Sequence, residues 1–195
     1  MSTQETIFRV DEKVKIVFLG SPSVGKTSIM NRWICGDYND RVSPTIAAAN
    51  IQKDIVINKK EYTVVVCDTA GEERYQSLCG NYVRGAHSVI IVASYDLPSS
   101  MEAINSWVNL VYEICPETTP IIIAKNKKDL VTEEHCDSEY NGFPLFHVSA
   151  KTGEGIEMVF TEAIFRGIEN MAMVTTPAVK LERANTSDQK ENTCC

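Results

Sequence analysis

Residues 20–27, GSPSVGKT, follow an apolar run at residues 14–19 and precede a helical pattern, SIMNRWI, at residues 28–34. This octapeptide matches the GxxxxGK[ST] pattern, in which backbone N–H groups surround a phosphate chain, a lysine contacts its outer phosphates and a hydroxyl ligates Mg²⁺. A flexible turn would also contain glycine, but a buried strand before the loop and a helix after it are the context that phosphate binding requires. The fixed positions of this predicted phosphate loop are Gly20, Gly25, Lys26 and Thr27.

Outward from this loop, strand patterns alternate with helical patterns. The predicted strands cover residues 13–20, 51–57, 62–67, 87–96, 118–126 and 143–150, and the predicted helices cover residues 28–34, 101–114, 131–139 and 155–173. Short strands that are apolar on both faces indicate a mostly parallel sheet with helices on both sides. The turn-like INKKE between the second and third strands predicts a hairpin, which adds one antiparallel edge.

Composition limits the class of protein. At 195 residues and 44% hydrophobic, the chain is long enough for one globular domain with a tail. A net charge of −7 leaves too little positive surface to bind nucleic acid by counterion release. The first residues lack the pattern of a signal peptide, and no apolar run approaches the ~20 residues of a membrane span, so an intracellular, non-spanning protein is expected. The seven cysteines lack CxxC spacing, which favours reduced and mostly buried thiols.

A second motif, NKKD at residues 126–129, comes at the end of a predicted strand. A carboxylate in this place accepts hydrogen bonds from both the ring N–H and the exocyclic amine of guanine, whereas adenine offers no such pair. Asp129 is therefore predicted to select guanine. NKxD alone is a weak signal, but it supports the phosphate loop that precedes it. SAK, residues 149–151, ends the last strand and is predicted to close over the base from the other side.

A third motif, DTAGEE at residues 68–73, ends the second strand of the hairpin. An acidic residue there can hold a water of Mg²⁺, and Gly71 allows its backbone N–H to approach a terminal phosphate. A tight turn with solvated acids would have the same composition. Such a turn does not explain why the motif lies where the metal would need it.

With these motifs in this order, the sequence resembles the Ras-like small GTPases and specifically the Rab family. Rab character is present in ERYQSL, in YVRGA and in the terminal CC, and TIAAAN resembles a segment of the early-endosomal Rabs. The resemblance implies a P-loop NTPase fold of the small G domain type, with a six-stranded mostly parallel sheet and five helices. The expected division is an N-terminal extension at residues 1–12, the G domain at residues 13–173, and a disordered tail at residues 174–195.

The resemblance also implies a nucleotide site and a switch cycle of GTP binding, hydrolysis and exchange. Thr45 and Gly71 would contact the γ-phosphate or its metal, so that hydrolysis releases residues 38–50 and 68–80. The implied phosphate contacts are Ser23, Val24, Gly25, Lys26, Thr27 and Ser28; the Mg²⁺ ligands are Thr27 and Thr45, with Asp68 acting through water; and the guanine contacts are Tyr38, Asn126, Lys127, Asp129, Ser149, Ala150 and Lys151.

Three departures from the family pattern concern catalysis and partners. Glu72 replaces the usual glutamine that orients the attacking water, and a carboxylate cannot donate to the phosphoryl oxygens. Pro22 lacks an N–H, and the resemblance implies that its bulky ring lies near the γ-phosphate and obstructs an incoming arginine. Both changes predict altered, slow hydrolysis and a switch biased toward GTP. Asn50 and Cys67 replace two aromatic residues of the usual effector patch, and of that patch only Tyr82 remains.

The last two residues, Cys194 and Cys195, are too close for an ordinary disulfide. The resemblance implies that both carry geranylgeranyl groups, which satisfies the two-signal requirement for stable membrane anchoring. The charges of the tail are balanced, so attraction to anionic lipid adds little.

The expected protein is thus a monomeric Rab-type switch on the cytoplasmic face of an endomembrane, cycling with the cytosol. Its implied partners are an exchange factor, a GAP, a GDP-dissociation inhibitor and effectors. A second hypothesis is a GTP-loaded module that recruits effectors and hardly hydrolyses. A third, a small P-loop kinase, lacks support because no arginine for a lid lies between Arg84 and Arg166.

Overall fold

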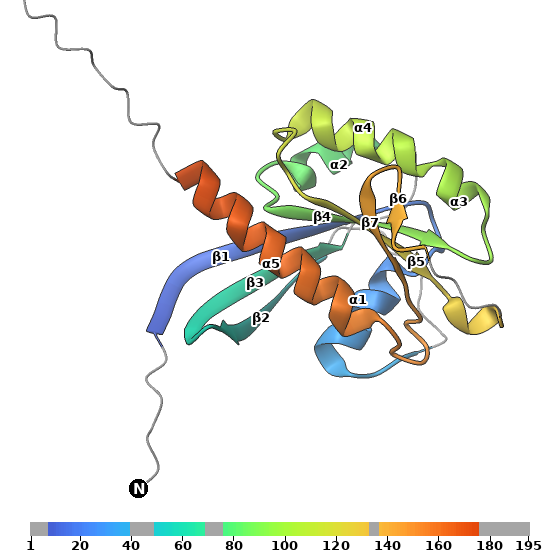
Figure 1. Cartoon of the computed structure of the whole chain (residues 1–195), viewed down its shortest axis with the longest axis horizontal. Helices are drawn as coiled ribbons and strands as arrows, with labels where there is room; N and C mark the ends of the chain where they lie inside the picture. The colour runs from blue at the N-terminus through green and yellow to red at the C-terminus, as the bar shows by residue number, and fades with distance from the viewer. Residues whose placement is uncertain (1–7, 40–48, 69–75, 133–136, 176–195) are drawn as a thin grey trace, which may run out of the picture.

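A computed structural model describes residues 8–39, 49–68, 76–132 and 137–175 (Figure 1). Within these ranges a single sheet has the strand order β2-β3-β1-β4-β5-β7-β6. The strands are β1 (Phe8–Leu19), β2 (Ala49–Ile57), β3 (Lys60–Asp68), β4 (Ser88–Ser94), β5 (Ile121–Asn126), β6 (Glu139–Tyr140) and β7 (Phe143–His147). The helices are α1 (Lys26–Cys35), α2 (Gln76–Val83), α3 (Ser99–Glu102), α4 (Ile104–Ile114), the 3₁₀ turn η2 (Lys128–Leu130) and α5 (Ile156–Thr175).

The sheet separates two hydrophobic layers. β1 pairs in parallel with β3 and β4, and its side chains alternate between the two faces. Val14, Ile16 and Phe18 pack with α1 and α5, whereas Val17 and Leu19 pack with α4. The helices accordingly cover both faces, with α1 and α5 on one side and α2, α3 and α4 on the other (Figure 1). The predicted α/β fold of a P-loop NTPase is confirmed.

The antiparallel hairpin is also confirmed. β2 and β3 pair from Ala49 opposite Asp68 to Ile57 opposite Lys60. The two residues between them, Asn58 and Lys59, have φ angles of 50° and 65°. Two successive residues with positive φ form the turn whose twist matches a two-residue hairpin. This geometry brings the end of β3, and with it Asp68, to the carboxyl edge of the sheet.

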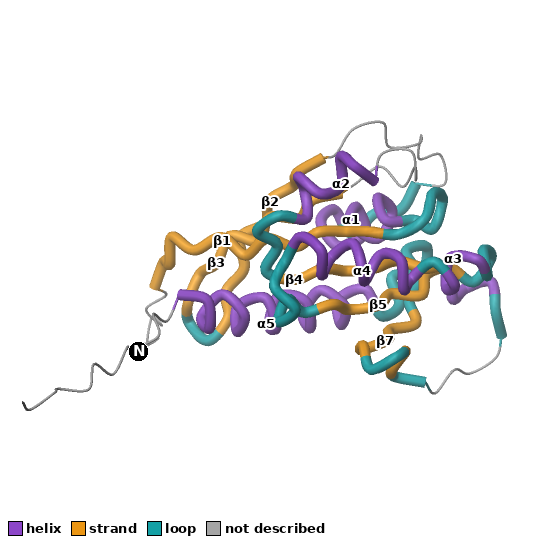
Figure 2. The backbone as a smooth tube through the Cα atoms, turned by 90° about the horizontal axis from the view of Figure 1, so that it is seen from above, coloured by secondary structure: helices purple, strands orange, loops and turns teal. Residues whose placement is uncertain are grey.

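Several boundaries differ from the sequence-based expectation. The sheet has seven strands rather than six, because the two-residue β6 adds an antiparallel pair beside β7. β1 begins at Phe8, inside the expected N-terminal extension, since its first residues pair with Lys60 and Glu61 of β3. α5 reaches Thr175, inside the expected tail. Figure 2 shows this helix extending along the length of the sheet.

Two helical predictions need correction. Residues 101–114 do not form one helix: α3 and α4 meet at Ala103, whose N–H donates to the carbonyl of Ser99 at 3.1 Å and whose carbonyl accepts from Ser106 Oγ at 2.7 Å. A serine hydroxyl bound to a nearby backbone carbonyl competes with the regular helical hydrogen bonds. No helix occupies residues 131–132 or 137–138, and β6 begins at Glu139; the middle of that predicted helix lies outside the described residues. Among the described cysteines, Cys67 and Cys115 are buried as expected, but Cys35 is exposed.

None of the helices in the described ranges combines the length and apolar character needed to cross a bilayer.

Candidate nucleotide-binding site

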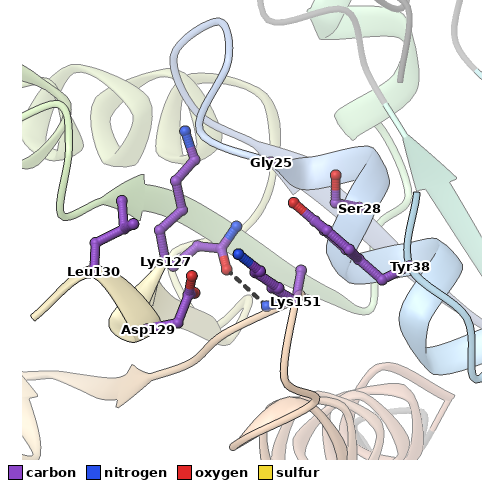
Figure 3. A pocket seen from close by; sticks show the side chains of 9 residues that line it. Gly25, Ser28, Tyr38, Lys127, Asp129, Leu130 and Lys151 are labelled. Carbon is purple, nitrogen blue, oxygen red and sulfur yellow. Dashed lines mark hydrogen bonds between the residues drawn. The ribbon is translucent and has the colours of Figure 1, made fainter. Parts of the chain in front are cut away.

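A cavity of about 270 Å³ opens at the carboxyl ends of the parallel strands, where ligands of open α/β sheets bind. Its volume is near the lower end of the ~300–1,000 Å³ typical of small-molecule sites. Figure 3 shows that its walls come from α1, from the segment after α1, from the β5–η2 connection and from the loop after β7. The lining residues are Gly25, Ser28, Tyr38, Asn126, Lys127, Asp129, Leu130, Ala150 and Lys151.

The phosphate loop between β1 and α1 depends on two glycines. Gly20 has φ of 135°, and a Cβ on it would lie 2.2 Å from the carbonyl oxygen of Val92. Gly25 has φ of 93° and caps the amino end of α1. A Cβ on Gly25 would clash with Asn126, because it would lie 2.3 Å from Nδ2. Both the left-handed backbone and the close approach exclude other residues. The N–H groups at the start of α1 are thereby available to an anion.

Lys26, the lysine of the phosphate-loop motif, is buried, with 5% of its surface exposed. Its Nζ donates to the carbonyl oxygens of Gly20 at 2.8 Å and Ser21 at 2.9 Å. These contacts place the ammonium inside the curve of the loop, where it would neutralise a phosphate that the loop surrounds.

Asn126 joins the phosphate loop to the loop that follows β7. Its Nδ2 donates to the carbonyl of Val24 at 2.9 Å, and its Oδ1 accepts from the N–H of Ala150 at 3.1 Å. The side chain is buried and uses both ends of its amide, so replacing it would leave two backbone groups without this partner. Sequence motifs separated by more than a hundred residues therefore converge at this amide.

Lys127 makes a second connection across the site. Its backbone is left-handed, with φ of 63°, and its Nζ donates to the carbonyl of Ser23 at 2.9 Å and to Asp96 Oδ2 at 2.6 Å. Burial alone would raise the pKa of Asp96, but hydrogen bonds from Lys127 and Ser94 outweigh this effect and lower the pKa. Asp96 thus remains a carboxylate that orients Lys127. The sequence prediction did not include Asp96, because only the fold brings the loop after β4 to this edge.

Asp129 lines the cavity on the same side as Lys127 and Leu130, across from Tyr38 (Figure 3). Its Oδ1 accepts a hydrogen bond from Ser149 Oγ at 2.6 Å, while the residue as a whole is exposed. Ser149 Oγ also accepts from the N–H of Thr152 at 3.1 Å. The SAK segment therefore holds this carboxylate through Oδ1, and Asp129 stands among the side chains that line the cavity, where it can accept hydrogen bonds from a ligand (Figure 3).

Thr27 and Asp68 supply two hard oxygen atoms at the end of the phosphate loop. Thr27 Oγ1 donates to Asp68 Oδ2 at 2.5 Å, although the two residues are 41 positions apart. A hydroxyl and a carboxylate are ligand types that suit Mg²⁺, so the donor set fits this ion. In the described parts of the chain, no group of three or more His, Cys, Asp or Glu residues is placed to hold a metal ion.

The structure brings most of the predicted site residues to one edge of the sheet. Ser28 and Tyr38 line the cavity as expected, and Leu130, which sequence reasoning missed, lines it beside Asp129. Leu130 directly follows NKKD and is 58% exposed, so an apolar residue after the motif was the available signal. Thr45, Gly71, Glu72, Cys194 and Cys195 lie outside the described residues.

The fold and the phosphate loop define a P-loop nucleoside-triphosphate-binding protein. A model of the Ras family matches residues 15–169. The Ras-related protein Rab7 of Drosophila melanogaster is 33% identical over 159 residues, covering 75% of this chain and 76% of the relative. The Ypt/Rab-type GTPase ypt7 of Schizosaccharomyces pombe is 30% identical over 171 residues, covering 81% and 83%. The Ras-related protein Rab-9A of Mus musculus is 29% identical over 196 residues, covering 93% and 96%.

The chain belongs to the Ras family, and within it to the Rab-type GTPases. It is accordingly a GTP hydrolase that acts as a GTP-binding switch in vesicle trafficking. The relatives reported above carry the names Rab7, ypt7 and Rab-9A, and they do not support the narrower early-endosomal placement.

Proposed function

We propose that this protein is a Mg²⁺-dependent, membrane-anchored Rab switch with slow intrinsic hydrolysis, whose timing depends on a GAP. The observation that supports guanine-nucleotide binding best is the convergence at Asn126. One buried amide holds Val24 of the phosphate loop and Ala150 of the SAK segment 2.9 and 3.1 Å away, with Asp129 at the mouth of the same cavity. A phosphate cradle and a guanine-selective carboxylate are thus fixed relative to each other.

Each part of the nucleotide has a proposed partner. The guanine edge donates to Asp129, and Tyr38 and Lys151 lie against the base. The phosphates accept from the backbone of residues 23–28 and from Lys26. Thr27 and Thr45 would ligate Mg²⁺, with Asp68 acting through water, and the metal when bound would neutralise phosphate charge. Gly71 would contact the terminal phosphate.

Slow hydrolysis rests on two residues near the γ-phosphate. Glu72 can accept from an attacking water but cannot donate to the transferring phosphoryl oxygens, and its charge opposes theirs. Pro22 is exposed on the phosphate loop, so its ring can obstruct an arginine that approaches from outside. A GAP that brings its own glutamine and arginine would bypass Glu72.

Membrane attachment is proposed through geranylgeranyl groups on Cys194 and Cys195, at the cytoplasmic face of an endomembrane, with cycling through the cytosol. The proposed partners of the monomeric protein are an exchange factor, a GAP, a GDP-dissociation inhibitor and effectors of Rab type.

The effector surface is unusual at the three positions where an aromatic patch is expected. Exposed Asn50 pairs with buried Cys67 across β2 and β3, and of the three positions only Tyr82, 37% exposed, is aromatic. Relatives named Rab7 favour that branch over the early-endosomal one.

A GTP-loaded recruiting module with little hydrolysis is the second candidate, favoured by the combination of Glu72 and Pro22. Extraction of bound nucleotide from freshly purified protein, followed by single-turnover GTP cleavage with Mg²⁺, separates the two. The proposed switch retains guanine nucleotide, and it cleaves GTP slowly but at a rate measurably above that of GTP without protein. Glu72→Gln is expected to cleave faster.

Each result has a defined meaning. A wild-type rate equal to that of GTP alone would favour the recruiting module. A GTP cleavage rate of the wild type above that of Glu72→Gln would contradict the proposal that Glu72 slows hydrolysis. Glu72 would then replace the usual glutamine as a functional residue. Absence of any retained guanine nucleotide, together with no binding of added GDP, would contradict the proposed function itself.

A further inference from the structure

The guanidinium of Arg32, in the last turn of α1, joins two parts of the site that are distant in sequence. Its Nη1 donates to the carbonyl of Gly36 at 2.8 Å, and its Nη2 donates to the carbonyl of Lys151 at 2.9 Å. Arg32 and Lys151 are 119 positions apart. One rigid planar group thus fixes the carboxyl end of the phosphate-loop helix against the loop that follows β7.

The peptide that Arg32 holds belongs to the wall of the cavity. Lys151 lines it, and the preceding residue, Ala150, is fixed by Asn126. Ser149 is fixed by its contact with Asp129. Each of residues 149–151 therefore has a hydrogen bond to a side chain. The side chains that contact Ser149 and Ala150 belong to the NKKD motif, whereas the one that contacts Lys151 comes from α1. Without Arg32, Lys151 would lose its tether to α1.

The packing around the guanidinium is also specific. Gly153 lies directly against it: a Cβ on Gly153 would come within 3.1 Å of Arg32 Nε and 3.3 Å of Nη2. Gly153 has φ of 89°, so the loop turns back at this point. The absence of a side chain lets the guanidinium approach the loop closely enough to reach the carbonyl of Lys151.

We propose that Arg32 is a positioning residue for nucleotide retention: by holding the Lys151 peptide against α1 with the help of Gly153, it sets how long a guanine nucleotide stays bound. The inference rests on the proposed function of this site. Arg32 acts through the backbone carbonyl of Lys151, a residue that lines the cavity.

The test measures release of a fluorescent GDP analogue, mant-GDP, from the full-length chain in excess GDP and Mg²⁺. Arg32→Ala removes both hydrogen bonds and is expected to release mant-GDP about three- to tenfold faster, since charge-assisted hydrogen bonds at partly exposed sites contribute modestly. Arg32→Lys keeps the positive charge but replaces the planar fork by a single ammonium that cannot reproduce both hydrogen bonds, so its release rate should lie between those of Arg32→Ala and wild type.

Arg166→Ala is the matched control. Arg166 lies on α5, where its Nε contacts Glu162 Oε1 at 2.5 Å within one helix face. This variant loses an exposed guanidinium far from the loop after β7, and its release rate should stay within about twofold of wild type. Equal acceleration in Arg166→Ala and Arg32→Ala would overturn the proposal.

Two further readouts separate positioning from a general structural role. Gly153→Ala should accelerate release less in the Arg32→Ala background than in wild type, because its Cβ then meets no guanidinium. The ratio of the mant-GDP release rates of Arg32→Ala and wild type should be the same with and without chelation of Mg²⁺. Arg32 acts on residues 149–151, whereas the metal acts at the phosphates. Independent, purely multiplicative effects of Arg32 and Gly153 would overturn the proposed contact.

Failure of this inference differs from failure of the proposed function. Wild-type protein that retains mant-GDP, with Arg32→Ala and Arg32→Lys releasing it at the wild-type rate, overturns the positioning role alone. A lowered thermal unfolding temperature with unchanged release would do the same, because it would show that Arg32 only caps α1. Wild-type protein that does not bind mant-GDP overturns the proposed function and this inference together.

Discussion

Thr27 Oγ1 donates a hydrogen bond to Asp68 Oδ2 at 2.5 Å, which joins the first turn of α1 to the last residue of β3. The contact exists because β1 and β3 are parallel neighbours, so the loop after β1 and the end of β3 reach the same edge of the sheet. A second Thr–Asp pair, Thr63 Oγ1 to Asp54 Oδ1 at 2.7 Å, lies exposed on the hairpin. The two pairs share their chemistry and differ in location.

Asp68→Ala is predicted to remove the dependence of nucleotide release on Mg²⁺. In the wild type, chelation should speed mant-GDP release by at least about tenfold, because the oxygen ligands and phosphates share the ion. In Asp68→Ala, release should already be fast and change by less than about twofold on chelation. Stopped-flow fluorescence with and without EDTA measures both factors.

Asp54→Ala is the matched control for this prediction. It removes a carboxylate from the same kind of hydrogen bond on an exposed strand, so its response to chelation should equal that of wild type. A wild-type response to EDTA that persists in Asp68→Ala would show that the metal is held without this carboxylate.

Asp129→Asn is predicted to change the base that the site prefers. The new amide can still accept from Ser149 through Oδ1, so the loop should keep its conformation. Toward the ligand it presents an N–H₂ group where guanine needs an acceptor, and guanine affinity should fall about a hundredfold or more. Xanthine, which has a carbonyl in place of the exocyclic amine, should bind better than in wild type.

Competition of GDP and XDP against mant-GDP measures this exchange of preference. Asp37→Asn is the control. Asp37 is exposed after α1, and its carboxylate accepts a hydrogen bond from the N–H of Tyr38. This variant should keep the preference for guanine. Equal loss of GDP and XDP in Asp129→Asn would mean that the substitution damaged the loop rather than changing the base preference.

Asn126→Ala is predicted to lower the free energy of unfolding by about 2–4 kcal/mol, because the carbonyl of Val24 and the N–H of Ala150 both lose a buried partner. Denaturant unfolding in saturating GDP measures the difference. Asn105→Ala removes an exposed amide whose Oδ1 accepts from Asn141 at 3.3 Å, and it should change the free energy by less than about 0.5 kcal/mol. A similar loss in both variants would contradict the role of Asn126 as a connector.

His87→Asn is predicted to make stability less sensitive to acid. Burial, and then the charge of Lys15, lower the pKa of His87, and its Nδ1 accepts from the N–H of Lys15 at 2.9 Å. Because the pKa in the folded protein is depressed, the neutral imidazole stabilises the fold above the ordinary pKa of 6.5, and this contribution is lost as pH falls. The Oδ1 of asparagine can accept the same hydrogen bond without titrating.

Denaturant unfolding at pH 7.5 and pH 5.5 tests this prediction. The loss of unfolding free energy between the two pH values should be smaller in His87→Asn than in wild type. An NMR titration of the imidazole protons provides an independent check, with one resonance in the wild type moving at lower pH than expected for a free histidine. A larger acid sensitivity in His87→Asn would contradict the assignment.

The class of fold could be predicted from the sequence because its determinants are local. The apolar run of β4, buried at every residue, and the GSPSVGKT loop before α1 each fix an element and its neighbour. The sequence analysis misses the two-residue β6 because it assigns residues 131–139 to a helix, although Asn141–Gly142 is a local hairpin signal that pairs Tyr140 with Phe143. At Ala103 the break coincides with a hydrogen bond from Ser106 Oγ to its carbonyl, which the apolar pattern of a helix does not reveal.

The residues of the site likewise fall into those that the sequence indicates and those that only the fold indicates. Lys26, Asn126 and Asp129 belong to motifs with a characteristic spacing, so they could be found in the sequence. Asp96 and Arg32 carry no motif, and their importance arises from where the strands and α1 place them. Side chains that hold the motif residues in place are visible only once the chain is folded.

The cavity takes its walls from four segments of the chain, at residues 25–28, 38, 126–130 and 150–151. No partly folded form can present all four, so a ligand bound there binds the native state alone. Its occupancy adds RT ln(1 + [L]/Kd) to stability, about 4 kcal/mol at a thousandfold excess over Kd. Substitutions that only loosen the cavity are therefore expected to lower the thermal unfolding temperature at a given concentration of guanine nucleotide, even where they remove no contact within the protein.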